Sequence, residues 1–197
     1  MAFSERTYSV LVASSAPRIT DALKRALAEV SAGASVSVTA VSSASAAREA
    51  FSETTFDILI IASPLPDEFG VRFAREIRAR HLCEILVVCP ADRYEDTFAR
   101  LMEEGILVVS RPMSEPVLIF ALRTLFTMRE RIRAMQSRAA SLEEKMAEIR
   151  TVNHAKWLLI DRLKMAEDDA QHYIEKQAMN LRISKGQLAE DIIRQYE

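Results

Sequence analysis

The feature that most constrains the fold is an alternation of short apolar runs with amphipathic stretches over residues 8–110. The apolar runs have the length of β-strands, and the segments between them place apolar residues at helical spacing. We expect strands at residues 8–13, 35–41, 84–89 and 106–110, and one that starts at Asp57 and ends at Ala62. Helices are expected at residues 18–31, 45–54, 69–81 and 93–104. Strands that alternate with helices predict a parallel sheet covered by helices on both faces.

The third predicted strand lies in the segment FDILIIASPLPDEFG at residues 56–70, and it ends without a reactive side chain. Chemistry in such sheets occurs at the carboxyl ends of the strands, yet the residue at this end is Ala62. Ser63 points to the other side of the sheet and Asp67 is simply a turn residue, so we expect neither to replace a missing nucleophile. Asp57 lies at the wrong end of the strand.

A second pattern follows the last predicted strand, where apolar residues recur at strict 4-3 spacing. Its members are Leu118, Ala121, Leu125, Met128, Ile132, Met135, Ala139, Leu142, Met146 and Ile149. Charged residues fill most positions between them from residue 129 onward, and no Pro or Gly occurs from Val117 to Lys185. The pattern predicts a helix that forms a dimeric coiled coil. The alternative is an amphipathic helix that folds back on its own domain.

The seam that we assign to this dimer consists of Leu125, Met128, Ile132, Met135, Ala139, Leu142, Met146 and Ile149. Asn153 and Lys156 occupy the next two seam positions and interrupt the apolar run. Short helices are expected beyond this point, at residues 157–163, 168–180 and 187–196. We therefore predict three parts: an α/β domain at 1–126, a coiled-coil linker at 127–150, and an all-α three-helix module at 151–197.

Composition limits the functions that the chain can have. Among 197 residues the net charge is −2, and residues 129–197 carry 13 basic and 12 acidic side chains, so nucleic-acid contacts must come from local clusters. The longest apolar runs are too short to span a membrane, and we expect a cytoplasmic protein. Cys83 and Cys89 form neither a disulfide framework nor a metal site. No catalytic residue, metal or cofactor is predicted, because nucleophile-base spacing and Gly-rich phosphate loops are absent.

The first part resembles the receiver domain of two-component response regulators, over about residues 6–126. Pro66, Gly70 and the pair Arg111-Pro112 carry the resemblance, together with the order of the strands. It implies a flavodoxin-like fold with a five-stranded parallel sheet. Receivers place two acidic residues after strand one, a phosphorylated Asp after strand three, Thr or Ser after strand four, and Lys before Pro after strand five. The carboxylates bind a divalent cation that neutralises the incoming phosphoryl group.

None of these functional positions holds the family's residue in this chain. The corresponding residues are Ser14, Ser15, Ala62, Cys89 and Arg111. The resemblance therefore implies a pseudo-receiver that lacks both the phosphoacceptor and the metal carboxylates. Arg111 remains as a cation that is available to an anion or to a carboxylate of a partner, and the alternative is an Arg bonded to a nearby loop carbonyl.

The C-terminal part resembles the ANTAR module, a three-helix RNA-binding unit found behind receiver domains in transcription antiterminators. The resemblance lies in VNHAKWLLIDRL (152–163), EDDAQHYIEKQAMNLRIS (167–184) and QLAEDII (187–193). It departs from the family at Trp157, where the family often has Gly. It also departs at residues 175–177, which are Glu-Lys-Gln where the family has an Arg-rich stretch. The resemblance implies a non-enzymatic homodimer that binds paired small RNA hairpins.

The predicted RNA contacts of this module are basic side chains, which supply affinity through phosphates. They are Lys156, Arg162, Lys164, Lys176, Arg182 and Lys185. Trp157, His172 and Tyr173 are candidates for stacking on unpaired bases. The alternatives are core packing for Trp157 and Tyr173, and a merely solvated ring for His172.

Two functions agree with these patterns. The first is an RNA-binding antitermination regulator whose pseudo-receiver is controlled by a protein partner or a ligand. Sequestration by a ligand-sensing protein, as in regulators of amide metabolism, is the precedent that the resemblance implies. The second is a dimeric protein-interaction scaffold that binds no RNA, which the nearly neutral charge of residues 129–197 favours.

Overall fold

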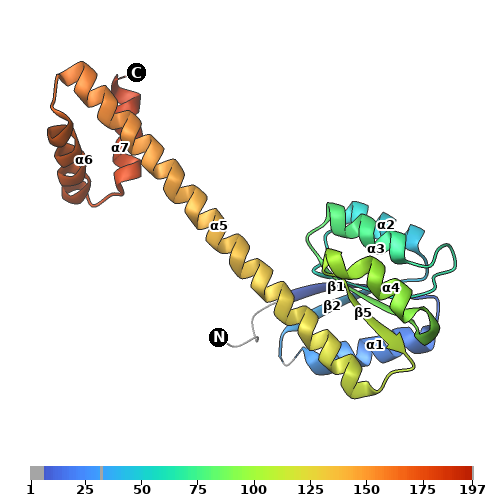
Figure 1. Cartoon of the computed structure of the whole chain (residues 1–197). Coiled ribbons are helices and arrows are strands. Elements are labelled where there is room, and N and C mark those ends of the chain that lie inside the picture. Colours follow the sequence, from blue (N-terminus) through green and yellow to red (C-terminus); the bar gives the residue numbers. More distant parts are fainter. Residues whose placement is uncertain (1–6, 32, 197) are drawn as a thin grey trace. The chain divides into compact units, whose positions relative to one another are not determined.

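The computed structural model of the chain describes residues 7–31 and 33–196. Residues 1–6 and 197, at the outer ends of two predicted domains, lie outside the described part, as does residue 32. The chain divides into two compact units, Met1–Ile132 and Arg133–Glu197. One helix, α5 (Glu115–Leu163), contributes residues to both units (Figure 1).

The first unit contains a parallel five-stranded sheet in the order β2-β1-β3-β4-β5. The strands are β1 (Thr7–Ala13), β2 (Ser35–Val41), β3 (Ile58–Ala62), β4 (Glu84–Pro90) and β5 (Leu107–Arg111). Each predicted strand is present with its ends shifted by at most one residue. The flavodoxin-like fold class predicted from the sequence is confirmed.

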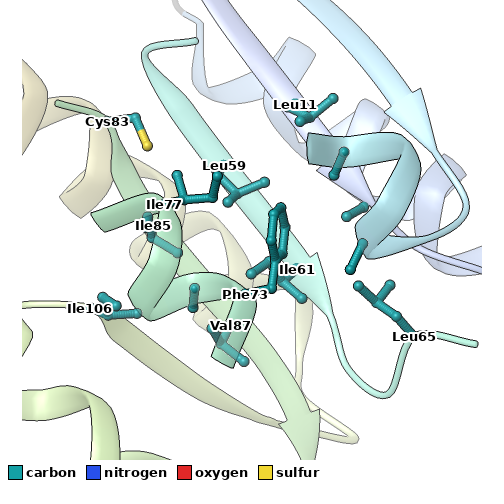
Figure 2. Packing of buried hydrophobic residues seen from close by; sticks show 14 of the residues in the cluster. Leu11, Leu59, Ile61, Leu65, Phe73, Ile77, Cys83, Ile85, Val87 and Ile106 are labelled. Carbon is teal, nitrogen blue, oxygen red and sulfur yellow. The ribbon is translucent and has the colours of Figure 1, made fainter. Parts of the chain in front are cut away.

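Helices cover both faces of the sheet (Figure 1). On one face pack α2 (Ala44–Glu53), α3 (Val71–Arg80) and α4 (Tyr94–Leu101), and on the other pack α1 (Pro17–Val30) and the start of α5. Alternate strand residues serve the two faces, so Leu11 faces the first set of helices and Val10 the second. Figure 2 shows the first core, in which Phe73 from α3 lies beside Ile61 of β3.

The loop after β3 is fixed by contacts with two helices. Both carboxylate oxygens of Asp67 accept backbone N–H bonds at the start of α2, from Ala44 at 2.9 Å and from Ser45 at 2.8 Å. Gly70, at φ 100°, caps the start of α3, and a Cβ there would come 2.9 Å from Cγ2 of Ile61. Asp67 is therefore a helix cap, a role that its position in a turn did not predict.

Polar contacts also hold α5 to the start of the sheet. Arg129 on α5 donates from Nε to Oδ1 of Asp57 at 2.8 Å and from Nη1 to the Leu82 carbonyl at 2.9 Å. The other oxygen of Asp57 accepts the N–H of Ser9 at 3.0 Å, and the Tyr8 hydroxyl donates to Glu130 at 2.7 Å. Asp57 is thus a structural anchor at the start of β3.

Two predictions about α5 are wrong. Leu125 was assigned to the dimer seam, but its side chain is fully buried in the core of the first unit with Leu122 and Phe126. The 4-3 spacing continues from this core into the exposed helix without a change in the pattern, so spacing alone could not separate them. The short helix expected at residues 157–163 is the last part of α5, because no Pro or Gly interrupts the helix.

The second unit packs the end of α5 against α6 (Glu167–Leu181) and α7 (Lys185–Tyr196). Small residues at Ala155, Ala170 and Ala189 are fully buried and let the three helices approach closely. Oε1 of Glu148 on α5 accepts the N–H of Gly186 at 3.1 Å, which ties the first turn of α7 to α5.

We expect Asp57→Asn to lower the free energy of unfolding by about 2 kcal/mol, because Arg129 is then left without a charged partner in a largely buried place. The side chains of Arg129 and Asp57 are only 13% and 12% exposed. Urea unfolding followed by circular dichroism measures the change. Asp92→Asn is the control, since Asp92 is 78% exposed and lies 3.8 Å from Arg93. Equal stability of the two variants would contradict the anchor role.

The cap formed by Asp67 predicts a pH dependence. Its two backbone hydrogen bonds lower the pKa of Asp67 below the ordinary 3.8. A lowered native pKa means that the cap stabilises fully above pH 3.8 and that this contribution is lost as the pH falls through the native pKa. Thermal unfolding between pH 7 and pH 3 should therefore show a smaller acid-dependent loss in Asp67→Asn than in the unaltered protein. Parallel curves for the two proteins would be the contrary result.

Candidate functional site

The predicted receiver positions meet at one edge of the sheet. Ala13 pairs with Ile61 and Ala62 pairs with Val88, so Ser14, Ala62 and Cys89 lie at adjacent strand ends. Pro90 pairs with Arg111, which brings the last strand to the same edge. Ser14, Ala62, Cys89 and Arg111 thus lie at or just after the carboxyl ends of the strands, and none of these four residues has a carboxylate.

The two buried serines of this edge are engaged in local hydrogen bonds. Oγ of Ser14 accepts the N–H of Ala16 at 3.2 Å, and the buried Ser63 hydroxyl donates to the Phe69 carbonyl. Ser15 is exposed. Within residues 7–31 and 33–196, no group of three or more His, Cys, Asp or Glu side chains is placed to hold a metal ion.

Arg111 crosses the edge from β5 to the loop after β3. Its Nη2 donates to the Ser63 carbonyl oxygen at 2.7 Å, while its buried Nε has no hydrogen-bond partner in the described part of the chain. This is the loop-carbonyl arrangement given above as the alternative for Arg111. The hydrogen bond ties the loop after β3 to the end of β5.

Cys89 stands where receivers carry a hydroxyl. It is fully buried, and its Sγ lies 3.7 Å from the Val109 carbonyl oxygen. Burial raises the pKa of Cys89, so the thiol stays protonated at neutral pH and is a poor nucleophile. Cys83 is also buried, and burial raises its pKa to about 12.

The middle of α5 presents an apolar stripe that no other described part of the chain covers. Its exposed members include Met128, Met135, Leu142, Met146 and Ile149. Ile132 is half-buried and Ala139 is exposed. The predicted seam without Leu125 is thus an unpartnered helix face, which is the arrangement that a coiled coil requires before it pairs.

In the second unit, one face of α6 combines rings with polar and charged groups. The residues His172, Tyr173, Lys176, Met179 and Asn180 recur at helical spacing and are all exposed. The opposite face carries Ala170, Ile174 and Ala178 into the core. We call the five exposed residues, together with the exposed Arg182 that follows the end of the helix, the α6 face.

The six basic residues predicted to contact RNA differ in whether a carboxylate neutralises them. Lys156 lies 2.8 Å from Glu167 and Lys185 lies 2.7 Å from Glu175, and these bonds lower the pKa of both carboxyl groups. Arg162 and Lys164 each lie 3.9 Å from Asp161.

Lys176 and Arg182 form no ion pair with another residue that the structure describes. The open positive charge therefore lies on the α6 face.

Backbone strain coincides with two of these cations. Within the described ranges, positive φ outside glycine occurs at Lys164 (54°) and Arg182 (55°), which follow the last residues of α5 and α6. Glycine is the usual residue at such a position, and a side chain there costs about 1 kcal/mol. A cation at this place also interacts favourably with the C-terminal end of the helix dipole.

The candidate stacking residues are accessible. Trp157 is 67% exposed, so the core-packing alternative is wrong for this residue, and Tyr173 lies on the exposed side of α6. Nδ1 of His172 lies 3.1 Å from the Asp168 carbonyl oxygen, which orients the ring at the surface. Met179 and Asn180 were missed in the sequence, although their spacing from Tyr173 and Lys176 places them on the same helix face.

Residues 140–193 match the ANTAR domain family. The transcriptional regulatory protein PdtaR from Mycobacterium tuberculosis strain H37Rv is 28% identical over 138 residues, which are 70% of this chain and 67% of the relative. The PdtaR of strain CDC 1551 / Oshkosh gives the same values. The ANTAR match begins inside the segment that we assigned to the linker.

Solved structures share the fold of the first unit. A signal receiver domain of an HD domain-containing protein from Pseudomonas fluorescens Pf-5 has a TM-score of 0.57 at 20% identity, covering 66% of this chain and 93% of that one. The response regulatory domain of mrkE from Klebsiella pneumoniae has a TM-score of 0.55 at 13% identity, covering 62% and 98%. Over residues 7–31 and 33–196, no helix is long and apolar enough to cross a membrane. The chain therefore joins a receiver-like α/β fold to an ANTAR domain at residues 140–193 and is similar to PdtaR.

Proposed function

We propose that this chain is an ANTAR-type transcription regulator that binds RNA through the α6 face and acts by antitermination. The observation that carries the proposal is that Tyr173 and Lys176 on α6, and Arg182 just after its end, are all exposed in a domain that matches the ANTAR family. A ring beside open cations suits single-stranded RNA loops, whose unstacked bases lie on aromatic or guanidinium planes while phosphates meet the positive charge.

The electrostatics of the α6 face favour selective over indiscriminate binding. Two of the six predicted cations are held in close ion pairs with Glu167 and Glu175, so little unpaired charge remains for phosphates in general. Affinity then depends more on contacts with particular bases than on counterion release. The proposed target is an RNA with paired small hairpins, each contacted by one copy of the domain.

A homodimer supplies the two copies. The exposed stripe of α5 from Met128 to Ile149 is the proposed dimer interface. Pairing buries this stripe, and linking two RNA-binding faces raises the effective concentration of the second hairpin once the first is bound.

The receiver-like unit has a different proposed role, because phosphorylation has no acceptor at the strand ends. Ala62 replaces the acceptor, the Ser63 hydroxyl is used by the Phe69 carbonyl, and Arg111 binds the loop above them. We therefore assign this unit to the control of the ANTAR domain by a protein partner or a ligand. The scaffold function, with no RNA binding, is the competing outcome in the first test below.

Lys176→Ala with Arg182→Ala should weaken binding to a fluorescent RNA that carries two small hairpins by roughly a factor of 100, because two phosphate or base contacts are lost. Binding of the unaltered protein should fall as salt rises, and the variant should show a shallower salt dependence. Fluorescence anisotropy at two salt concentrations measures both quantities.

Arg194→Ala is the matched control for this RNA experiment. Arg194 is exposed on a different helix, α7, and lies 3.7 Å from Asp191. We expect its affinity to equal that of the unaltered protein. Absence of RNA binding by a folded, dimeric protein would favour the scaffold function. Equal losses of affinity in both variants would show that overall positive charge, and not the α6 face, determines RNA binding.

Incubation with Mg²⁺ and a small phosphoryl donor such as acetyl phosphate should leave the mass of the protein unchanged. The side chain of Ala62 has no nucleophilic atom, and neither Ser14 nor Ser15 supplies a carboxylate for the cation. Ala62→Asp alone should also remain unphosphorylated, because the carboxylates that bind the cation are still missing. Intact-mass spectrometry reads both outcomes, and a gain of one phosphoryl group by the unaltered protein would refute the proposed loss of this chemistry.

A further inference from the structure

Trp157 is the only tryptophan of the chain, and it lies exposed at the end of the α5 stripe. The rest of the chain leaves most of this large apolar ring in contact with solvent. Such an exposed indole is a candidate contact for another surface. In the heptad set by Met146 and Ile149, Asn153 is at position a, Val152 at position g and Trp157 at position e.

A hollow of about 320 Å³ lies beside Val152 within the second unit. Its lining is Glu148, Ile149, Val152, Asn153, Gln171 and Lys185. Ile149 and Val152 make its floor apolar, while the other four residues give it a polar rim. The hollow thus borders the proposed seam on the g side and has the size of an indole ring with room to enter.

We propose that Trp157 of one copy of the chain inserts into this hollow of a second copy. In a parallel two-stranded coiled coil, a residue at g faces the residue at e of the following heptad on the other helix. Val152 at g therefore faces Trp157 of the second copy, and the hollow lies at that place. The contact forms twice in a symmetric dimer. The inference rests on the proposed homodimer.

The charge pattern beside the seam selects the parallel orientation. The g positions Arg131, Arg138 and Lys145 are all basic, and an antiparallel pair sets g against g, so Arg138 would face Lys145. In the parallel pair, Arg138 faces Glu143 of the second copy, an attractive contact, while Lys145 faces Arg150. The antiparallel arrangement has no attractive pair among the g positions Arg131, Arg138 and Lys145.

Asn153 fixes the register of the same arrangement. Its side chain is exposed, and a single Asn at an a position favours alignment with the same residue across a parallel dimer, because each amide then satisfies the other. An antiparallel seam would place this amide against an apolar residue.

The fluorescence of Trp157 tests the insertion directly, since no other residue contributes tryptophan emission. Across a dilution series whose dimer fraction is measured by analytical ultracentrifugation, emission should move to shorter wavelength and acrylamide quenching should fall severalfold as the dimer forms. Leu142→Asp, at an exposed seam position, supplies the monomer reference. A dimer with unchanged emission, or a chain that stays monomeric at every concentration measured, overturns the proposal.

A substitution that fills the hollow separates insertion from general burial at the seam. Gln171→Phe should expel the indole, weaken the dimer about tenfold and leave the emission of the remaining dimer close to that of the monomer. His172→Phe is the matched control on the exposed side of α6, and we expect it to change neither quantity. Equal dimer affinity and equal emission of the two variants would show that the hollow does not receive Trp157.

Cross-linking tests the orientation. Under mild oxidation, Asn153→Cys should form a disulfide dimer, whereas Glu144→Cys, on the opposite side of the helix, should not. Cys83 and Cys89 are buried and do not interfere. A dimer of Asn153→Cys that fails to cross-link overturns the parallel register. None of these measurements contains RNA, so failure of the RNA-binding proposal is a separate result.

Discussion

The continuity of helix α5 is the constraint on which the rest of the structure depends. Because no Pro or Gly interrupts it, one helix passes from the core of the first unit, through an exposed stripe, into the core of the second. Its side chains at Leu122, Leu142 and Leu159 are respectively buried, exposed and buried again. The same residue type therefore serves three environments, and only the surrounding elements distinguish them.

The spacing of apolar residues predicted the secondary structure of the first unit. The strands, the helices of the first unit and the strand-end positions at Ser14, Ala62 and Arg111 follow from spacing and from the parallel order of the sheet. The assignment of Leu125 failed because a 4-3 pattern describes both a core-facing helix and a coiled-coil seam. The separate helix at residues 157–163 failed because a change in polarity was taken as a helix end, although no residue there stops a helix.

Contacts between distant segments could not be derived from the sequence. The cap that Asp67 provides for Ala44 and the anchor between Asp57 and Arg129 join residues far apart in the chain, and each needs a precise meeting of elements. The same limit applies to the cations of the ANTAR domain. Their types were evident from the sequence, but the carboxylates that neutralise Lys156 and Lys185 emerge only when the helices pack.

Those two ion pairs are not equivalent, and the difference bears on the proposed RNA contacts. Lys185 and Glu175 are 49% and 43% exposed, so their pair contributes little to stability and a phosphate can replace the carboxylate at small cost. Lys156 is only 16% exposed and joins α5 to the first residue of α6, so releasing it would disturb the connection between those helices. Lys185 is therefore an exchangeable cation, whereas Lys156 has a structural role. Among Lys156, Lys176, Arg182 and Lys185, one cation is thus held, one is exchangeable, and Lys176 and Arg182 form no ion pair with another described residue. The proposed contributions of these four residues to RNA binding are therefore unequal.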